Sequence, residues 1–157
     1  MLTAEYVRGI VDGEGSFTVY VRDPHEVRVG NRRVKVEPKF ILKLQEQDLP
    51  VLEGLQKFFE CGKIYRQPDH RPNHQNCFRF EVFNRAELQE VIIPFFRDHL
   101  PQAPSKRHDF EVFAIIIELL SQKQHATSDG LEQIWKLKRQ MHRGSPNAGN
   151  PLVRWEH

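Results

Sequence analysis

The chain has 157 residues, of which 39% are hydrophobic, and this length suits a single domain with its own core. The net charge is only +2, so a nucleic-acid partner has to be recognised from the distribution of charge instead. Two cysteines exclude a disulfide framework, nothing resembles a secretory signal, and no apolar run approaches the roughly 18 residues that span a bilayer. We expect an intracellular domain without a membrane partner, in the cytoplasm, the nucleoid or an organelle.

The first predicted element is a short helix with two glycines on one face. Thr3 is a suitable N-cap, and Gly9 and Gly13 are four residues apart, which puts them on the same side. A glycine costs an exposed helix about 1 kcal/mol relative to alanine, so the pair suggests that another helix packs closely here. Two acids, Asp12 and Glu14, end the helix directly before a strand. The stretch predicts an interface that also carries chemistry.

Two strands follow, because apolar and polar residues alternate over about residues 16–22 and 33–44. A loop with Gly30-Asn31 joins them. Phe17 and Phe40 are typical of the positions that face the core. The opposite face of the two strands carries Ser16, Thr18, Tyr20, Arg22, Arg33, Lys35, Glu37, Lys39 and Lys43.

A helix and a hairpin come next. Asp48 is the predicted N-cap of a helix that ends near Gly62. Residues 63–66 and 77–83 alternate as the two arms of the hairpin, and a polar segment forms its tip. The outward positions of the hairpin are Lys63, Tyr65, Arg79 and Glu81.

Three helices complete the pattern, over about residues 85–99, 105–122 and 131–142. Their predicted caps are Asn84, Ser105 and either Ser128 or Asp129, and Pro94 should kink or restart the first helix. We expect residues 1–143 to form one domain and residues 144–157 to form a tail that is disordered or extended. The order of elements predicts an α+β fold with one antiparallel sheet and helices on one face.

The segment Val7-Arg8-Gly9-Ile10-Val11-Asp12-Gly13-Glu14-Gly15 resembles the LAGLIDADG motif of homing endonucleases. Glu14 stands in place of the second acid, and Arg8 replaces the usual small residue. The similarity covers about residues 6–118 in the family order. It includes the strand–helix–hairpin section and a later helix start at which a lysine precedes an Asp-Phe pair, seen in residues 40–52, 56–59, 62–65 and 105–110. The resemblance implies an αββαββα fold whose four-stranded sheet forms a saddle on DNA.

Hydrolysis of a phosphodiester needs an activated water and stabilised charge, which divalent metals provide, and Mg²⁺ prefers carboxylate oxygens and water. One Glu14 is too little for such a site, whereas two protomers packed through Gly9 and Gly13 would bring two Glu14 carboxylates together. We expect Glu14 to bind Mg²⁺, with Mn²⁺ or Ca²⁺ as substitutes. Asp12 should be mainly structural, with a metal role as the lesser alternative, and the resemblance adds the Gly13 carbonyl as a ligand.

The resemblance also implies two further catalytic residues. Lys106 falls on the family's lysine near the scissile phosphate, where a cation stabilises charge or orients water. Gln45, or a residue next to it, would position solvent. Without the resemblance, the simplest interpretations are that Glu14 begins a surface turn and that Lys106 is an ordinary surface lysine. A zinc set of Cys61, His70, His74 and Cys77 fits no common spacing and is not expected.

The outward sheet positions predict a DNA-binding surface, because basic residues neutralise phosphates and polar ones contact base edges in the major groove. One motif copy implies a homodimer, since the family's monomeric members carry two copies, and a dimer axis predicts a near-palindromic target. The expected function is Mg²⁺-dependent double-strand cleavage of DNA, and the resemblance further implies a long site, short 3′ overhangs and an intron-encoded enzyme. The alternatives are a catalytically silent maturase, which binds its own intron RNA, and a DNA-binding regulator.

Overall fold

The protein is described here by a computed structural model that covers residues 1–25 and 34–142. Its four strands form one antiparallel sheet in the order β1-β2-β4-β3. The strands are β1 (Gly15–Val21), β2 (Val36–Gln45), β3 (Lys63–Gln67) and β4 (Cys77–Val82). The helices are α1 (Ala4–Glu14), α2 (Leu49–Phe59), α3 (Arg85–Glu87), α4 (Ile93–Asp98), α5 (Pro104–Ser121) and α6 (Ser128–Lys138), with short turns η1 (Glu46–Asp48), η2 (Leu88–Ile92) and η3 (Gln124–Ala126).

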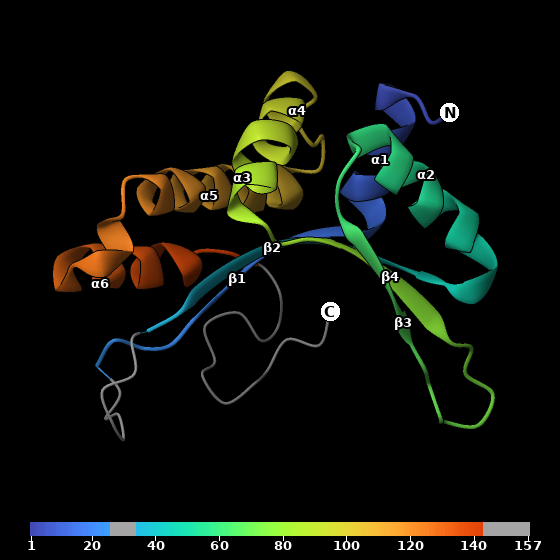
Figure 1. Ribbon diagram of the computed structural model, residues 1–157, viewed down its shortest axis with the longest axis horizontal. Coiled ribbons are helices and arrows are strands. Elements are labelled where there is room, and N and C mark those ends of the chain that lie inside the picture. Colours follow the sequence, from blue (N-terminus) through green and yellow to red (C-terminus); the bar gives the residue numbers. More distant parts are fainter. Residues whose placement is uncertain (26–33, 143–157) are drawn as a thin grey trace.

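The sheet is arched, and α1, α2, α4 and α5 lie over its convex side (Figure 1). The predicted α+β architecture with helices on one face is therefore confirmed. None of the helices in residues 1–25 and 34–142 is both long and apolar enough to cross a membrane.

The first half of the chain follows the sequence pattern closely. Thr3 caps α1, because its Oγ1 accepts a hydrogen bond of 3.1 Å from the Tyr6 N–H. Two details differ. β2 begins at Val36, later than predicted. Asp48 stands at the N-cap of α2 but makes no side-chain cap bond, because it belongs to the 3₁₀ turn η1 that leads into the helix.

The second half shows where local cap signals were misleading. Asn84 caps α3 as predicted and accepts from the Glu87 N–H at 3.1 Å. Ser105 does not cap α5, which starts one residue earlier at Pro104 with Ala103 at the N-cap. Thr127, and neither Ser128 nor Asp129, caps α6 through a 3.0 Å bond from the Gly130 N–H.

Pro94 affects the helix in a way that the sequence did not specify. The chain runs from α3 through the π-helical turn η2 into α4, and Pro94 lies in the first turn of α4. Proline has no N–H and its ring crowds the preceding turn, and a wider π turn accommodates this inside a continuous helix.

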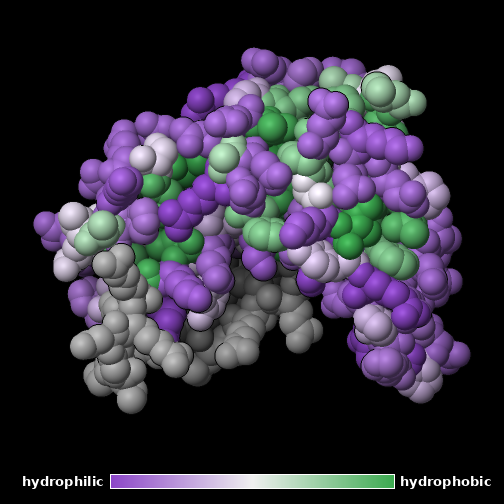
Figure 2. All heavy atoms as spheres, viewed as in Figure 1, coloured by the Kyte–Doolittle hydropathy of each residue, from purple (hydrophilic) through white to green (hydrophobic). Residues whose placement is uncertain are grey.

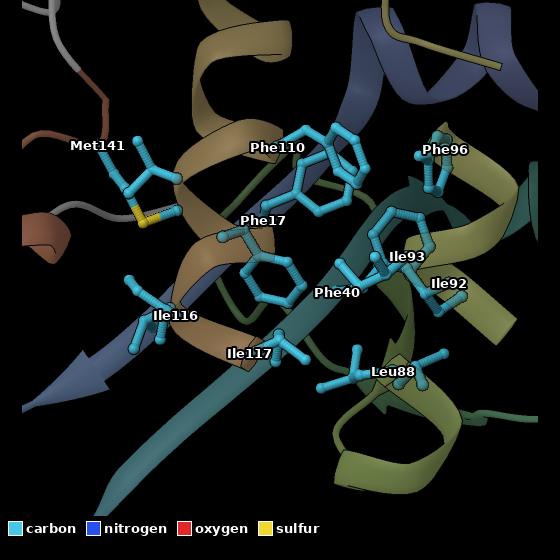
Figure 3. Packing of buried hydrophobic residues seen from close by; sticks show 14 of the residues in the cluster. Phe17, Phe40, Leu88, Ile92, Ile93, Phe96, Phe110, Ile116, Ile117 and Met141 are labelled. Carbon is cyan, nitrogen blue, oxygen red and sulfur yellow. The ribbon is translucent and has the colours of Figure 1, made fainter. Parts of the chain in front are cut away.

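The core lies between the sheet and the helices and centres on Phe17, which is fully buried. Its ring centroid is 5.3 Å from that of Phe40 on β2 and 5.3 Å from that of Phe96 on α4. The rings of Phe110 and Phe113 on α5 are each 5.4 Å away. Figure 3 shows how this cluster joins β1, β2, α4 and α5. It fixes the end of α1 relative to α5, because β1 continues directly from α1.

Phe17→Ala is expected to lower the free energy of unfolding by about 3–5 kcal/mol, since it removes buried apolar surface and leaves a cavity. Denaturant unfolding followed by circular dichroism measures the change. Tyr20→Ala, at a position that is 56% exposed on the same strand, should stay within about 0.5 kcal/mol of the parent. Equal effects of the two substitutions would contradict the placement of the core.

Candidate active site

Two of the predicted catalytic residues, Glu14 and Lys106, lie at the junction of α1, β1 and α5. Glu14 is the last residue of α1 and is exposed, and Gly15 opens β1. Lys106, in the first turn of α5, donates a hydrogen bond from Nζ to the Gly15 carbonyl. A residue distant in sequence is thereby fixed beside the acidic end of α1.

Asp12 ties α1 to the start of α5. Its carboxylate accepts from the backbone N–H of Gln102 at 2.9 Å and of Ala103 at 3.2 Å. α5 has no side-chain cap of its own, so Asp12 supplies an oxygen acceptor and a negative charge at the positive end of that helix. Asp12 thus has a structural role, as expected, and its partners are backbone amides of the segment before α5. Its role toward a metal stays a prediction.

Lys106 is half-buried among acidic groups. Burial lowers its pKa, and the negative charges of Asp109, Asp12 and Glu14 act in the opposite direction. The acids therefore favour the charged ammonium that desolvation disfavours. Burial is the larger effect, so the pKa of Lys106 is lowered overall.

Gln45 lies at the same end of the sheet. Gly15 pairs with Leu42, so β2 continues beyond the start of β1 and ends at Gln45. Its Oε1 accepts from Gln47 Nε2 at 2.8 Å, and the side chain is exposed. A role in positioning water stays a prediction.

The donor set suits a hard divalent cation only in part. Among residues 1–25 and 34–142, no three His, Cys, Asp or Glu side chains gather where they could hold a metal. Both carboxylate oxygens of Asp12 already accept from backbone amides, and the exposed Glu14 and the adjacent Gly13 carbonyl are further oxygens at this end of α1. Six oxygen ligands are typical for Mg²⁺, so the rest must come from water, phosphate or a second copy of the domain.

The two glycines of α1 are open to the outside. A Cβ built on Gly9 or Gly13 would have no atom within 4 Å. Neither glycine therefore serves packing within the described part of its own chain. The predicted helix–helix contact therefore lies outside the described residues, and its assignment to a second copy stays a prediction.

The predicted DNA-binding residues lie on the sheet face opposite the core. Cross-strand pairing puts Lys43, Arg79 and Tyr65 in one row and Ile41, Glu81 and Lys63 in the next. The β1 and β2 positions, with the residues that flank them, are Ser16, Thr18, Tyr20, Arg22, Lys35 and Lys39, and Arg33 lies outside the described residues. Figure 2 shows hydrophilic side chains over the arm that β3 and β4 form.

Three features of this face were missed by the sequence pattern. Ile41 lies on it by register, although it is apolar. Phe83 and Arg85 help to line a hollow of about 530 Å³ on this side. Glu81 was expected to face outward, but it is only 5% exposed and forms an ion pair with Arg79.

The comparison with known proteins matches nearly the same stretch of the chain as the resemblance seen in the sequence. Residues 7–117 match the family model described as LAGLIDADG endonuclease. The chain belongs to this family. Similar proteins include the homing endonuclease I-ApeII of Aeropyrum pernix, which is 31% identical over 121 residues covering 76% of this chain and 65% of its own length. A probable intron-encoded endonuclease 2 of Neurospora crassa is 29% identical over 94% of this chain but only 30% of its own length.

Solved structures agree with the LAGLIDADG fold. The homing endonuclease I-TnaI is 30% identical with a TM-score of 0.74, and the match covers 92% of this chain and 90% of that one. I-SmaMI, bound to uncleaved DNA target with calcium ions, is also 30% identical with a TM-score of 0.78. This match covers 92% of the present chain and 46% of I-SmaMI. The chain therefore spans about half of I-SmaMI and about a third of the Neurospora relative.

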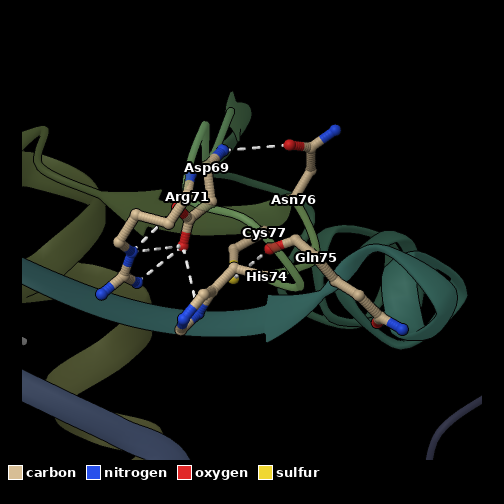
Figure 4. Close-up of polar contacts among 6 residues, drawn as sticks. All are labelled: Asp69, Arg71, His74, Gln75, Asn76 and Cys77. Carbon is tan, nitrogen blue, oxygen red and sulfur yellow. Dashed lines mark hydrogen bonds and ion pairs between the residues drawn. The ribbon is translucent and has the colours of Figure 1, made fainter.

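Asp69 holds the tip of the hairpin formed by β3 and β4. Its carboxylate binds Arg71 through Nε and Nη2, the latter at 2.6 Å, and lies 3.7 Å from His74 Nδ1 (Figure 4). The side-chain and backbone hydrogen bonds from Arg71 lower the pKa of Asp69 well below its usual range. Asn76 closes the tip by accepting from the Asp69 N–H at 2.9 Å.

Two residues of the zinc set that was not expected, His74 and Cys61, have surroundings that can be described. His74 faces Asp69, as Figure 4 shows. Burial and then the charge of Glu87 raise the pKa of Cys61 to about 11. Because metals bind the thiolate, a thiol that stays protonated at neutral pH is a poor ligand.

Asp109 anchors the end of the domain near Lys106. It is 7% exposed and accepts from the His142 backbone N–H at 2.8 Å, and its Oδ2 lies 3.1 Å from His142 Nδ1. Burial raises the pKa of Asp109, but the hydrogen bonds and charge of His142 outweigh it and lower the pKa overall. In the sequence, Asp109 is marked only by the Asp-Phe pair that follows Lys106. Its partner His142 lies 33 residues further along the chain.

Asp109→Asn is expected to lower the free energy of unfolding by about 1.5–3 kcal/mol at neutral pH, the range for hydrogen bonds to a charged group. The folded-state pKa lies below the unfolded value of about 3.9, so this stability is present above that value and is lost as pH falls through the folded pKa. Denaturant unfolding of both proteins at pH 7 and at pH 3 tests this. A difference that grows at pH 3 would contradict the lowered pKa of Asp109.

Proposed function

We propose that the protein is a site-specific homing endonuclease that cleaves both strands of a long DNA target by divalent-metal-dependent hydrolysis. The observation that carries this proposal is the junction at the end of α1. There Glu14 is exposed, Asp12 is tied to α5, and Lys106 is held at the Gly15 carbonyl beside them. In this proposal the exposed Glu14 carboxylate and the Lys106 ammonium, which lie near each other beside the sheet face that carries the basic residues, are the acid and the cation that act on the phosphodiester.

In this proposal Glu14 and the Gly13 carbonyl would hold Mg²⁺, or Mn²⁺ or Ca²⁺ in its place. Such a cation, when bound, activates water and stabilises the charge on the attacking and leaving oxygens. The Lys106 ammonium stabilises charge at the scissile phosphate, and Gln45 orients a water molecule by hydrogen bonding. Asp12 contributes indirectly, by holding α5 and therefore Lys106 in place.

The active enzyme in this proposal is a homodimer joined through the Gly9 and Gly13 face of α1. Support comes from the open space beside both glycines and from the incomplete donor set of one copy. The two-fold axis of such a dimer requires a near-palindromic target. The match to I-SmaMI covers 46% of that protein, which is about one half of it.

A cleavage assay separates this proposal from a silent nucleic-acid binder such as a maturase or a regulator. The purified protein is incubated with duplex DNA that spans its own insertion site, in parallel with Mg²⁺, Ca²⁺ and EDTA. We expect cleavage of both strands in Mg²⁺ and binding without cleavage in Ca²⁺. Binding in all three conditions with no cleavage in Mg²⁺ would exclude the nuclease and favour the silent binder.

A further inference from the structure

We propose that Arg79 recognises a guanine base in the major groove, and that Glu81 is the positioning residue that fixes Arg79 for this contact. The inference rests on the proposed function, because it assumes that the outer sheet face lies against duplex DNA. It reassigns Glu81, whose outward place in the strand pattern suggested a DNA contact of its own.

The Arg79 side chain is held from two sides. Its Nε lies 2.9 Å from Glu81 Oε1, and its guanidinium carbon is 5.4 Å from the centre of the Tyr65 ring on the neighbouring strand. The Nε–Oε1 contact is too bent for a hydrogen bond, so Nε is buried without a hydrogen-bond partner and is held by charge. Cross-strand pairing puts Tyr65 beside Arg79 on β3 and Lys43 beside it on β2.

Glu81 lies too deep to reach a ligand itself. The side chain of Glu81 is 6% exposed, whereas that of Arg79 is 35% exposed. Removing a carboxylate from water is costly unless a cation compensates, so Glu81 and Arg79 stabilise each other. The exposed part of the pair belongs to Arg79. Glu81 therefore acts on a ligand through the guanidinium.

The position of Arg79 favours a base over a phosphate. β4 lies inside the sheet, between β2 and β3. Arg79 also lines the hollow of about 530 Å³, together with Lys39, Tyr65 and Arg85. When the sheet lies against duplex DNA, side chains on its inner strands face the base edges in the groove. Side chains near the edges of the sheet face the DNA backbone.

Guanine is the base that this group fits. The planar guanidinium donates two parallel hydrogen bonds, which match the O6 and N7 acceptors of guanine in the major groove. Lysine has the same charge but lacks this planar arrangement of donors. Because Glu81 and Tyr65 already restrict the side chain, less conformational entropy is lost when it binds. In a homodimer the guanine appears once in each half-site.

The test is a binding selection from a pool of DNA duplexes with a long randomised segment, in Ca²⁺ so that DNA is bound without cleavage. The bound duplexes are sequenced for the parent, Arg79→Lys, Arg79→Gln and Glu81→Gln. The parent should enrich guanine at one position per half-site. Arg79→Lys, which keeps the charge and can still donate to guanine but lacks the planar fork, should weaken the preference there and leave other positions unchanged. Arg79→Gln should change the preference at that position to adenine.

Glu81→Gln keeps the shape of the side chain and removes its charge. It should weaken the preference at the same position alone by roughly 2- to 12-fold, the cost of ordering one side chain. Thermal unfolding of each variant shows that it remains folded. A guanine preference unchanged in Arg79→Gln would overturn the contact, and a preference unchanged in Glu81→Gln would overturn the positioning role. A parent that enriches no sequence would instead overturn the proposed function.

Discussion

Glu14→Gln is expected to reduce DNA cleavage by roughly 10³-fold while DNA binding persists, because an amide replaces the carboxylate that would hold the divalent cation. Glu14 is exposed at the end of α1 and takes no part in the core, so the fold should not change. Single-turnover cleavage in Mg²⁺ and binding in Ca²⁺ measure the two effects separately.

The matched control is Glu53→Gln, which makes the same chemical change at an exposed position of α2. This variant should cleave at the parental rate. Cleavage by Glu14→Gln at the parental rate would remove Glu14 from the active site. Loss of binding together with cleavage would give Glu14 a role in DNA contact or assembly instead.

The fold was predictable because its signals are local. The alternation around Phe17 identifies β1 and its core face, and the Thr3 side chain bonds a backbone N–H only three residues away. The hairpin arms also follow from alternation, and their pairing was predicted within one residue at each end. Such patterns depend on chain geometry that every strand and helix shares.

The site was predictable only in part, because its contacts join distant parts of the chain. Nothing near Asp12 in sequence indicates that its partners are the amides of Gln102 and Ala103. The predicted cap of α5 failed for the same reason, because the side chain that accepts from the backbone before α5 is Asp12 of α1. Alternation assigned Glu81 to the correct face, but a period of two carries no information on whether a charged side chain is buried by its neighbour.

These contacts give α1 two roles. Its C-terminal end carries Glu14 and holds Lys106 near it, through Asp12 and the Gly15 carbonyl. Its exposed glycine face is the surface proposed for dimer contact. In the proposed dimer, a shift of α1 against a partner helix would move both the acid and the lysine, so that assembly and catalysis would depend on each other.

Gly9→Leu is expected to convert the dimer into monomers and to abolish cleavage without unfolding the domain. Within its own chain a new side chain at Gly9 meets open space, and leucine also favours a helix by several tenths of a kcal/mol over glycine. The folded monomer should therefore be as stable as before, or more so. Against a closely packed partner the same side chain costs about 1–3 kcal/mol, and symmetry applies this cost twice.

The dimer dissociation constant should then rise by roughly 30- to 10⁴-fold, which sedimentation velocity over a range of protein concentrations measures. Gln133→Leu places the same side chain on an exposed face of α6 and should leave assembly unchanged. The combination of an intact monomer and a lost dimer distinguishes an interface glycine from a structural one. If Gly9→Leu still dimerises with the parental constant, the contact between two α1 helices is wrong, and the two Glu14 carboxylates must meet in another way.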